Sequence, residues 1–356
     1  MIPKHKDKSM IGGRLMLGDA IRLWSIVTVI WGILYGTAVG APLPESQTGK
    51  WRLVREIPLP GSASRFDYMS LDPADNRLYL AHLGDGRLVV FDTKKMEVIA
   101  NLGGFPHVHG VLVVPGLHRV YATVSPLSRR KAGSLVVLDS RTLRRVAKIP
   151  VGIHPDGLDY ESTTGRVFVS NEWGGSVSVV DAMHGQVIGT IPLGGEVGNT
   201  RVDTVTHRVW ATVQTQNLLV GMDPKTLTVV RRIPLPCHHP HGLLILGKRH
   251  LALVACEKDA SLLGVGLVTG TILFRSTTGK RPDVLSEDPS RHLLFVASES
   301  GTVDVYRLGD HLEKLSEKFL GFRAHSVLAD PRRSLLYFPF ENVRGRPVLR
   351  IYEWNK

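Results

Sequence analysis

The chain has 356 residues, and no linker-like or low-complexity stretch divides the part that follows residue 50. That length is large for one hydrophobic core but ordinary for a repeat protein, in which each repeat packs only on its neighbours. The net charge of +12 would suit nucleic acid or a membrane surface. However, the basic residues are spread along the chain and no nucleic-acid-binding module is present, so the sequence gives a nucleic-acid partner no support.

The first 41 residues have the pattern of a targeting segment, in which basic residues precede an uncharged run from Leu23 to Pro44. The basic residues are Lys4, Lys6, Lys8, Arg14 and Arg22. Small residues at 38–41 offer a cleavage site, but Pro42 disfavours cleavage and the run approaches the length of a membrane-spanning helix. We therefore expect a signal peptide or an uncleaved anchor at 1–41 and a short linker at 42–50. The protein would be exported, periplasmic or extracellular, and would touch a membrane only through an uncleaved anchor.

From residue 51 onward the sequence repeats itself at a spacing of 42 to 47 residues. A period in this range, built of short alternating strands, is typical of a β-propeller blade. The third repeat shows four such strands, separated by polar turns, at 154–160, 166–171, 175–181 and 186–191. Four strands per period predict one blade per repeat, and the seven repeats predict an all-β, seven-bladed β-propeller.

Apolar positions support the same alignment of the repeats. The second strand of each repeat has a large apolar side chain at one position, which should be buried if the register is right. These side chains are Tyr79, Tyr121, Phe168, Trp210, Leu253, Phe295 and Tyr337. The last repeat lacks a fourth strand, whereas Trp51 to Ile57 resemble one. We expect this N-terminal strand to complete the last blade and close the propeller over residues 51–356.

One register position near the start of each repeat has Asp or His in six of the seven repeats. These residues are Asp67, His109, Asp156, His241, Asp283 and His325, and the fourth repeat has Gly198 there with Asn199 beside it. Two positions upstream stand Arg65, His107, His154, Glu196, His239, Arg281 and Arg323. Because side chains alternate along a strand, both sets should face the same way, toward the axis of the propeller. We therefore predict a double polar ring in the central channel.

We expect this ring to bind a ligand. The predicted ligand-binding residues are Arg65, Asp67, His107, His109, His154, Asp156, Asn199, His239, His241, Arg281, Asp283, His325 and Arg323. Neutral imidazole is the commonest transition-metal ligand in proteins, and the carboxylates could complete or orient a metal site. Candidate metal ligands are His109, His154, His239, His241 and His325, although their spacing follows the blade period and forms no compact motif. Three interpretations of the ring stay open: a structural ring that hydrogen-bonds loops and water, a binding site for a small molecule or peptide, and a site for a transition metal.

Catalysis has weaker support than binding. Neighbouring ring members, such as His109 with Asp156 or His241 with Asp283, could form a general-base pair. The sequence has no nucleophile elbow, phosphate-binding glycine loop, zinc-ligand quartet or haem-attachment motif. We therefore favour a monomeric binding protein and assign no catalytic residue. The alternatives are a metal-assisted lyase or hydrolase that uses the ring, and a propeller that binds a protein partner through its loops and sides.

Cys237 and Cys256 are the only cysteines. An exported protein meets an oxidising compartment, which favours a disulfide. Antiparallel pairing across a turn at 247–249 would place Cys256 opposite Pro240 and Cys237 three residues further out, slightly out of register for a bond. The sequence leaves the bonded and the free states equally open.

The repeat resembles that of a known family. Gly165–Asn171, Gly175–Asp181 and Val187–Ile191 are similar to the repeat of the YVTN-type seven-bladed propellers, which include the bacterial YncE-like proteins and archaeal surface-layer propellers. The resemblance covers nearly all of residues 51–356. It implies an exported propeller used for binding, because some of these relatives are linked to DNA and others to the cell surface. Streptogramin-inactivating lyases, which also have a seven-bladed propeller and a histidine at the site, are the fold-level analogue for the enzyme alternative.

Overall fold

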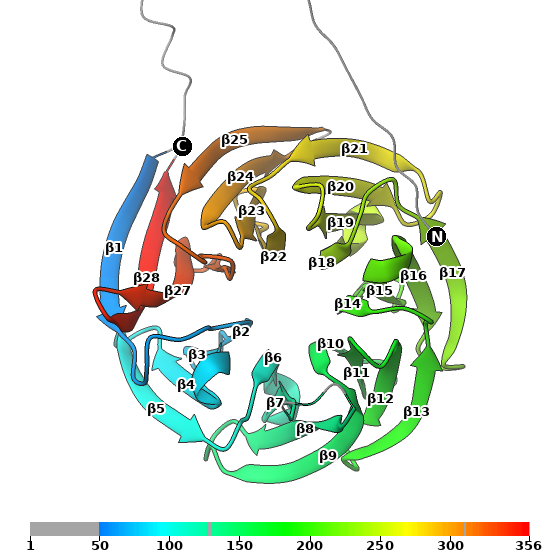
Figure 1. The fold of residues 1–356 in the computed structure, drawn as a ribbon, viewed down its shortest axis with the longest axis horizontal. Coiled ribbons are helices and arrows are strands. Elements are labelled where there is room, and N and C mark those ends of the chain that lie inside the picture. Colours follow the sequence, from blue (N-terminus) through cyan, green and yellow to red (C-terminus); the bar gives the residue numbers. More distant parts are fainter. Residues whose placement is uncertain (1–49, 127, 129, 310, 356) are drawn as a thin grey trace, which may run out of the picture. The chain divides into compact units, whose positions relative to one another are not determined.

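The computed structural model describes residues 50–355, except residues 127, 129 and 310. The predicted targeting segment at 1–41 and the linker up to residue 49 lie outside the described residues. No helix in the described part is long and apolar enough to cross a membrane. This part consists of seven four-stranded antiparallel sheets arranged around a central axis (Figure 1). The predicted all-β, seven-bladed β-propeller is confirmed.

Each sheet runs from an innermost strand beside the axis to an outermost strand at the rim (Figure 1). The first blade contains β2 (Met69–Asp72), β3 (Arg77–His82), β4 (Arg87–Asp92) and β5 (Glu97–Gly103). The second contains β6 (Val108–Val114), β7 (Arg119–Val124), β8 (Ala132–Asp139) and β9 (Arg145–Ile153). The third contains β10 (Pro155–Glu161), β11 (Arg166–Asn171), β12 (Ser176–Asp181) and β13 (Gln186–Pro192), each within one residue of its predicted bounds.

The remaining blades follow the same plan. The fourth contains β14 (Val197–Val202), β15 (Val209–Val213), β16 (Leu218–Asp223) and β17 (Thr228–Pro234). The fifth contains β18 (Pro240–Leu246), β19 (Leu251–Cys256), β20 (Ser261–Gly266) and β21 (Ile272–Thr277). The sixth contains β22 (Pro282–Asp288), β23 (Leu293–Ser298), β24 (Thr302–Leu308) and β25 (Leu312–Phe319). Short 3-10 turns are η1 (Leu83–Asp85), η2 (Pro115–Leu117), η3 (Gln214–Gln216) and η4 (Gly247–Arg249).

The seventh blade joins strands from both ends of the propeller. It contains β26 (Leu328–Asp330), β27 (Leu335–Val343), β28 (Arg346–Asn355) and, at the rim, β1 (Lys50–Pro58). Strand β1 pairs antiparallel with β28, so that Ile57 lies opposite Leu349. The ring of Trp51 packs edge-on against that of Trp354, with centroids 5.2 Å apart. The predicted closure by an N-terminal strand is confirmed.

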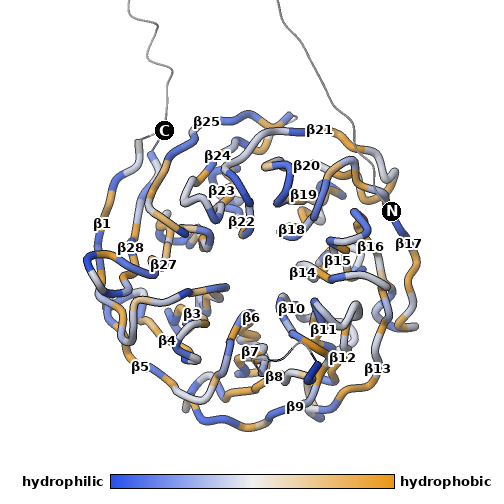
Figure 2. Tube along the Cα trace, in the orientation of Figure 1, coloured by the Kyte–Doolittle hydropathy of each residue, from blue (hydrophilic) through white to orange (hydrophobic). Residues whose placement is uncertain are grey.

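The hydrophobic core lies between neighbouring blades. The side chains predicted at the common second-strand position are all buried, which confirms the register. Phe168 shares a buried cluster with Val209 of the next blade, and Trp210 shares one with Leu243 of the blade after that. Hydrophilic segments occur toward the axis, including those beside β10 and β22 (Figure 2). The apolar faces therefore hold the blades together and leave polar residues for the channel.

The innermost strands are irregular at the predicted ring position. In β6, Val108 pairs with Val124 and Val111 pairs with Ala122, so two residues of β6 lie opposite one residue of β7. The extra residue in this bulge belongs to the pair His109-Gly110, and β10, β14 and β18 shift at the same place. Bulges re-aim side chains and are common beside functional sites. The bulge, not a regular strand, therefore orients the ring residues of these blades.

Glycine follows the ring residue in several blades because the innermost strands converge. A Cβ atom on Gly110 would lie 2.3 Å from the carbonyl oxygen of Asp156, and one on Gly242 would lie 2.0 Å from that of Asp283. The hydroxyl of Thr123 donates a hydrogen bond to the same Asp156 carbonyl at 2.9 Å. Neighbouring ring positions are therefore held in place through their backbones.

Cys237 and Cys256 form a disulfide, with their Cα atoms 6.1 Å apart. Cys256 pairs with Pro240 across the strands β18 and β19, as the sequence predicts. Both cysteines are buried in the cluster that contains Trp210 and Leu243. The segment that leads to the axis in the fifth blade is therefore covalently tied to the second strand of that blade.

Candidate functional site

The upstream residues of the predicted double ring do not lie in extended strands. His107, His154 and His239 precede β6, β10 and β18, and their φ angles are 44°, 53° and 59°. Arg281 and Arg323 also have positive φ angles, 55° each. The prediction that strand alternation directs both sets the same way is therefore wrong. A left-handed backbone conformation, which histidine adopts more readily than most residues, positions these five members of the upstream set instead, whereas Arg65 and Glu196 lack it.

Three ring aspartates lie within 4 Å of two ring histidines, His109 and His241. His109 Nδ1 is 2.8 Å from Asp67 Oδ2 and 3.8 Å from Asp156 Oδ1. His241 Nε2 is 3.4 Å from Asp283 Oδ1 and 3.9 Å from Asp156 Oδ2. The two His/Asp pairs named from the sequence are neighbours, but the short hydrogen bond of His109 goes to Asp67. Asp156 lies between the two imidazoles.

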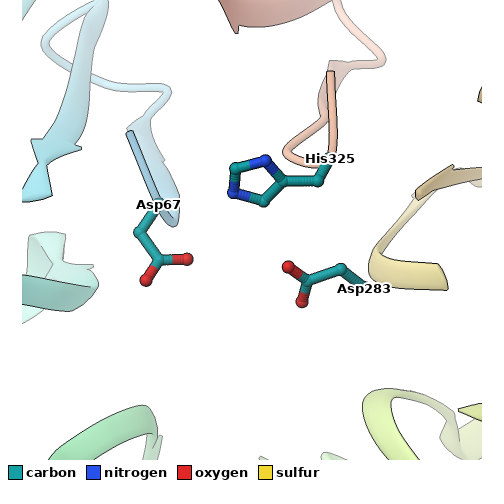
Figure 3. A group of neighbouring side chains, drawn as sticks. All are labelled: Asp67, Asp283 and His325. Carbon is teal, nitrogen blue, oxygen red and sulfur yellow. The ribbon is translucent and has the colours of Figure 1, made fainter. Parts of the chain in front are cut away.

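His325 lies beside Asp67 and Asp283 on the other side of the ring (Figure 3). Its Nδ1 donates a hydrogen bond to the carbonyl oxygen of Arg323 at 2.8 Å, and its Nε2 has no hydrogen-bond partner among the described residues. One ligand atom from each of His325, Asp67 and Asp283 lies within 4.8 Å of the other two. Asp67, His109 and Asp156 form a second group of this kind.

Burial and mutual contact shift the pKa values of the ring. Burial raises the pKa of Asp156 and of Asp283, although neighbouring histidines oppose this. Burial would also raise the pKa of Asp67, but the hydrogen bond and the charge of His109 hold it well below its usual range. Burial lowers the pKa of His241, yet the surrounding carboxylates, above all Asp283, raise it to about 9. Asp67 therefore has the lowest pKa of the three ring aspartates, and His241 is protonated at neutral pH.

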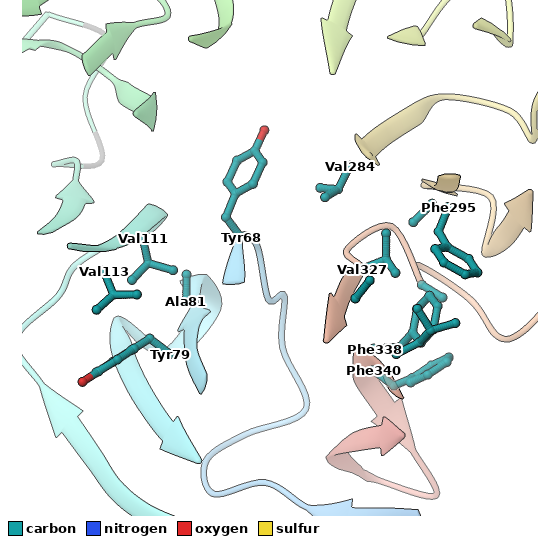
Figure 4. Close-up of a cluster of buried hydrophobic side chains, with 14 of the residues drawn as sticks. Tyr68, Tyr79, Ala81, Val111, Val113, Val284, Phe295, Val327, Phe338 and Phe340 are labelled. Carbon is teal, nitrogen blue, oxygen red and sulfur yellow. The ribbon is translucent and has the colours of Figure 1, made fainter. Parts of the chain in front are cut away.

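Tyr68 is a central residue that the sequence reasoning missed. Its hydroxyl lies 3.1 Å from His241 Nε2 and accepts a hydrogen bond from Asn199 Nδ2 at 2.8 Å. The side chain points away from Tyr79 of its own blade and toward the centre (Figure 4). It occupies the position after the ring residue, where other blades have Gly110, Gly157 and Gly242. This departure from glycine was the available signal.

Tyr68 lines two cavities. One cavity of about 420 Å³, here called the mouth cavity, is lined by Arg65, Asp67, Tyr68, Leu83, His109, Asp156, Glu172, Gln214, His239, His241, Glu257, Arg281, Asp283 and Glu299. A second of about 220 Å³, the far cavity, is lined by Tyr68, Met69, Ser70, Gly110, Val111, Leu112, Gly157, Leu158, Asp159 and Arg201. Tyr68 is the one residue that these two linings have in common.

Glutamates form part of the mouth cavity, and the sequence reasoning missed them too. They share one repeat position at the end of the second strand. The residues at this position in the seven blades are Leu83, Ser125, Glu172, Gln214, Glu257, Glu299 and Glu341. Glu172 Oε2 lies 3.3 Å from His154 Nε2, and Glu257 Oε2 lies 3.1 Å from His239 Nδ1. Glu299 Oε1 accepts a hydrogen bond from an Arg65 guanidinium nitrogen at 2.6 Å. Their regular spacing would have revealed them.

The structure brings most, but not all, of the predicted site residues together. Those that line the mouth cavity are Arg65, Asp67, His109, Asp156, His239, His241, Arg281 and Asp283. Asn199 is connected to the site by the hydrogen bond that it donates to the Tyr68 hydroxyl. The ring of His154 stacks on that of Trp173, with centroids 3.6 Å apart. His107 and Arg323 do not line the cavity, and Arg323 instead pairs with Glu341 at 3.2 Å.

Two of the five histidines predicted as metal ligands lie in a group of ligand atoms that could hold an ion. These are His109 and His325. The other three, His154, His239 and His241, lie outside the two such groups found among the described residues. A bound transition metal stays a prediction.

No protein-family model and no curated protein matches this chain. A solved structure of U3-55K superposes with a TM-score of 0.70, covering 85% of this chain and 98% of that chain. The two sequences are 11% identical. The likeness shows the fold alone. It supports a seven-bladed β-propeller, which is compatible with a binding or interaction role, and leaves the YVTN-type family an expectation.

Proposed function

We propose that this protein is an exported binding propeller of the YVTN type, and that its mouth cavity takes a small cationic ligand. The observation that carries the proposal is the charge of the cavity lining. Six carboxylates line the cavity, Asp67, Asp156, Glu172, Glu257, Asp283 and Glu299, whereas the positive charges of the lining come from Arg65, Arg281 and protonated His241. The whole chain has the opposite balance, 44 basic against 32 acidic residues. The acidic character is therefore local to the cavity.

The geometry of the cavity adds to this argument. Its volume of about 420 Å³ falls in the range of small-molecule sites in proteins. The positive charge of Arg65 is already matched by Glu299, which accepts its hydrogen bond. Carboxylates on low-dielectric walls focus a negative potential into a concave site and raise the local concentration of cations.

Support for export comes from two independent features. Residues 1–41 have a basic start followed by an uncharged run, the pattern of a targeting segment. The disulfide between Cys237 and Cys256 would persist in an oxidising compartment and is rare in the cytosol. Kinship with the YVTN-type propellers draws support from the repeat sequences of the third blade and from the seven-bladed fold.

The test is binding of defined cations to the chelator-treated protein. Spermidine, putrescine and agmatine should raise the melting temperature of the protein, whereas succinate and citrate at the same ionic strength should not. A double change, Glu172→Gln with Glu257→Gln, removes two charges from the lining and keeps hydrogen-bonding groups. It should weaken cation binding at least about tenfold, equivalent to roughly 1.4 kcal/mol.

Glu341→Gln is the matched control, because Glu341 occupies the same repeat position in the seventh blade but pairs with Arg323 outside the cavity. This variant should bind the cations as the unmodified protein does. Stabilisation by the anions only, no stabilisation by any of the three cations, or equal binding by the double variant would each contradict the proposal.

A further inference from the structure

The geometry points to a binding site for one divalent first-row transition-metal ion, held by Asp67, Asp283 and His325 beside the mouth cavity (Figure 3). This inference deepens the proposed function and rests on it, because Asp67 and Asp283 also line the cavity proposed to take cations. The three residues come from the first, sixth and seventh blades, which are neighbours in the ring.

The spacing of the three side chains fits a shared ion. Their ligand atoms lie within 4.8 Å of one another, and all three residues are buried. Nitrogen and oxygen ligands lie roughly 2 Å from a bound zinc ion, so atoms on opposite sides of one ion are about 4 Å apart. Small side-chain rotations would therefore bring all three atoms into coordination.

His325 supplies an independent observation that points to an ion. The side chain is 1% exposed, and Nδ1 donates its proton to the Arg323 carbonyl, so Nε2 of the neutral ring carries a lone pair. This Nε2 has no hydrogen-bond partner among the described residues, and it is turned toward Asp67 (Figure 3). If Nε2 carried a proton instead of a lone pair, no acceptor among the described residues would lie within hydrogen-bond distance of it. Buried polar atoms without partners are rare in native proteins, and a cation between the three groups would satisfy this one.

A hydrogen bond orients the carboxylate of Asp67 from behind, whereas Asp283 keeps one oxygen open. His109 Nδ1 donates a hydrogen bond to Oδ2 of Asp67 at 2.8 Å, which leaves Oδ1 of that carboxylate for an ion. His241 Nε2 lies 3.4 Å from Oδ1 of Asp283, and this oxygen has no hydrogen bond among the described residues. Hydrogen-bonding partners of this kind fix metal ligands in many proteins.

The second group of ligand atoms, Asp67, His109 and Asp156, is the weaker candidate. His109 Nδ1, the nitrogen that lies 2.8 Å from Asp67 and 3.8 Å from Asp156, is already hydrogen-bonded to Asp67, so it holds a proton and offers these carboxylates no lone pair. In His325, by contrast, the proton is on the far nitrogen and the near one is open. The geometry therefore assigns the ion to the group that contains His325.

The chemistry of the donors selects the class of ion. Two carboxylate oxygens and one imidazole nitrogen, without sulfur, suit Mn²⁺, Fe²⁺ or Zn²⁺ better than Cu⁺. Three protein ligands leave coordination positions for water or for a ligand in the mouth cavity. Such an ion is also what the alternative function, a metal-assisted lyase or hydrolase, would require.

The experiment titrates MnCl₂ and ZnCl₂ into the full chain, produced without a polyhistidine tag and freed of metal by a chelator. Calorimetry should show one ion per chain. His325→Gln and Asp283→Asn should each weaken binding by more than the roughly 10- to 100-fold that loss of an outer-shell partner costs. His107→Gln is the matched control, because His107 stands near the mouth but does not line the cavity, and its affinity should be unchanged.

Folding of each variant is checked by circular dichroism and by its melting temperature without metal. Pulsed EPR of the Mn²⁺-loaded unmodified protein gives a readout that needs no variant, and it should show coupling to one imidazole nitrogen. Absence of that coupling, no binding of either metal, or full affinity in His325→Gln overturns the assignment. Loss of binding in His109→Gln with full affinity in His325→Gln would move the ion to the second group.

The same proteins separate this inference from the proposed function. The double change Glu172→Gln with Glu257→Gln should weaken binding of spermidine at least about tenfold while leaving one Mn²⁺ per chain. Metal binding without any binding of organic cations would refute the cationic-ligand proposal and keep the metal site. Binding of organic cations by a protein that takes up no metal would refute the metal site and keep the cationic-ligand proposal.

Discussion

The hydroxyl of Tyr68 lies 3.1 Å from Nε2 of His241, although 173 positions separate the two residues in the sequence. Tyr68 belongs to the first blade and His241 to the fifth, so the contact crosses the central axis (Figure 1). Asn199 of the fourth blade donates a hydrogen bond to the same hydroxyl. One phenol group thus joins three blades and lines both the mouth cavity and the far cavity.

Replacing Tyr68 by Phe should destabilise the propeller. The change leaves Asn199 Nδ2 and His241 Nε2 without their shared partner in a buried site, and an unsatisfied buried polar group costs about 1–3 kcal/mol. Urea unfolding followed by fluorescence measures the loss. Tyr160→Phe is the control, because the ring of Tyr160 is only partly buried, and it should change the free energy of unfolding by less than about 0.5 kcal/mol. Equal stability of the two variants would show that the central hydroxyl contributes nothing.

Gly242→Ala should disturb the ring through the backbone. The added methyl group would lie 2.0 Å from the carbonyl oxygen of Asp283, which belongs to the next blade and cannot rotate away. Overpacking of this kind costs about 1–3 kcal/mol, measurable as a lower urea midpoint. Gly116→Ala has no atom within 4 Å of the new methyl group and should be neutral. If Gly242→Ala is as stable as Gly116→Ala, the innermost strands are less tightly placed than described.

Reduction of the disulfide should lower the stability of the fifth blade. Cys237 and Cys256 are 19 positions apart, and a cross-link that closes a loop of this size contributes about 3 kcal/mol by restricting the unfolded chain. Dithiothreitol should therefore lower the melting temperature of the unmodified protein. The double variant Cys237→Ala with Cys256→Ala should start from the lower value and show no response to the reductant. A response of similar size in the double variant would mean that the reductant acts elsewhere.

Glu161 should make the stability of the protein depend on acid pH. Burial opposes ionisation of Glu161, but hydrogen bonds from Thr163 and Thr164 outweigh it and lower the pKa from 4.5 to about 2. Because the folded pKa lies below the unfolded one, the contribution is complete above pH 4.5 and is lost as the pH falls toward 2. Glu161→Gln should flatten the fall in urea midpoint across that interval. An unchanged pH dependence in Glu161→Gln would argue against the shift.

The fold could be predicted because its signals are local and repeated. The apolar position shared by Tyr79, Phe168 and Trp210 recurs once per blade, so an error in one repeat would show against the others. Even the closing strand could be recognised, since residues 51–57 carry the pattern of a fourth strand without three strands before it. Each blade buries its apolar faces on its neighbours, and this requirement is visible in the sequence of every repeat.

The site could be predicted only in part because its contacts depend on which blades face each other. The repeat identified Asp67, His109 and Asp156 as ring residues, but no local pattern shows that Tyr68 reaches across the axis to Asn199. Strand alternation also failed for the upstream residues, because a left-handed turn precedes the innermost strands. The glutamates could have been found, since their spacing follows the same period as the ring.

The pairing of β1 with β28 has a consequence for how the chain acquires its structure. Arg52 and Glu353 face each other across this pair, although 301 positions separate them in the sequence. Contacts between such distant residues carry the largest loop-closure cost and slow folding. During synthesis the first six blades can assemble in order, while β1 waits without a partner until the last strand emerges from the ribosome. The seventh sheet is thus completed last. Separation of β1 from β28 would open the closed ring of blades, while the other six blades keep their internal hydrogen bonds.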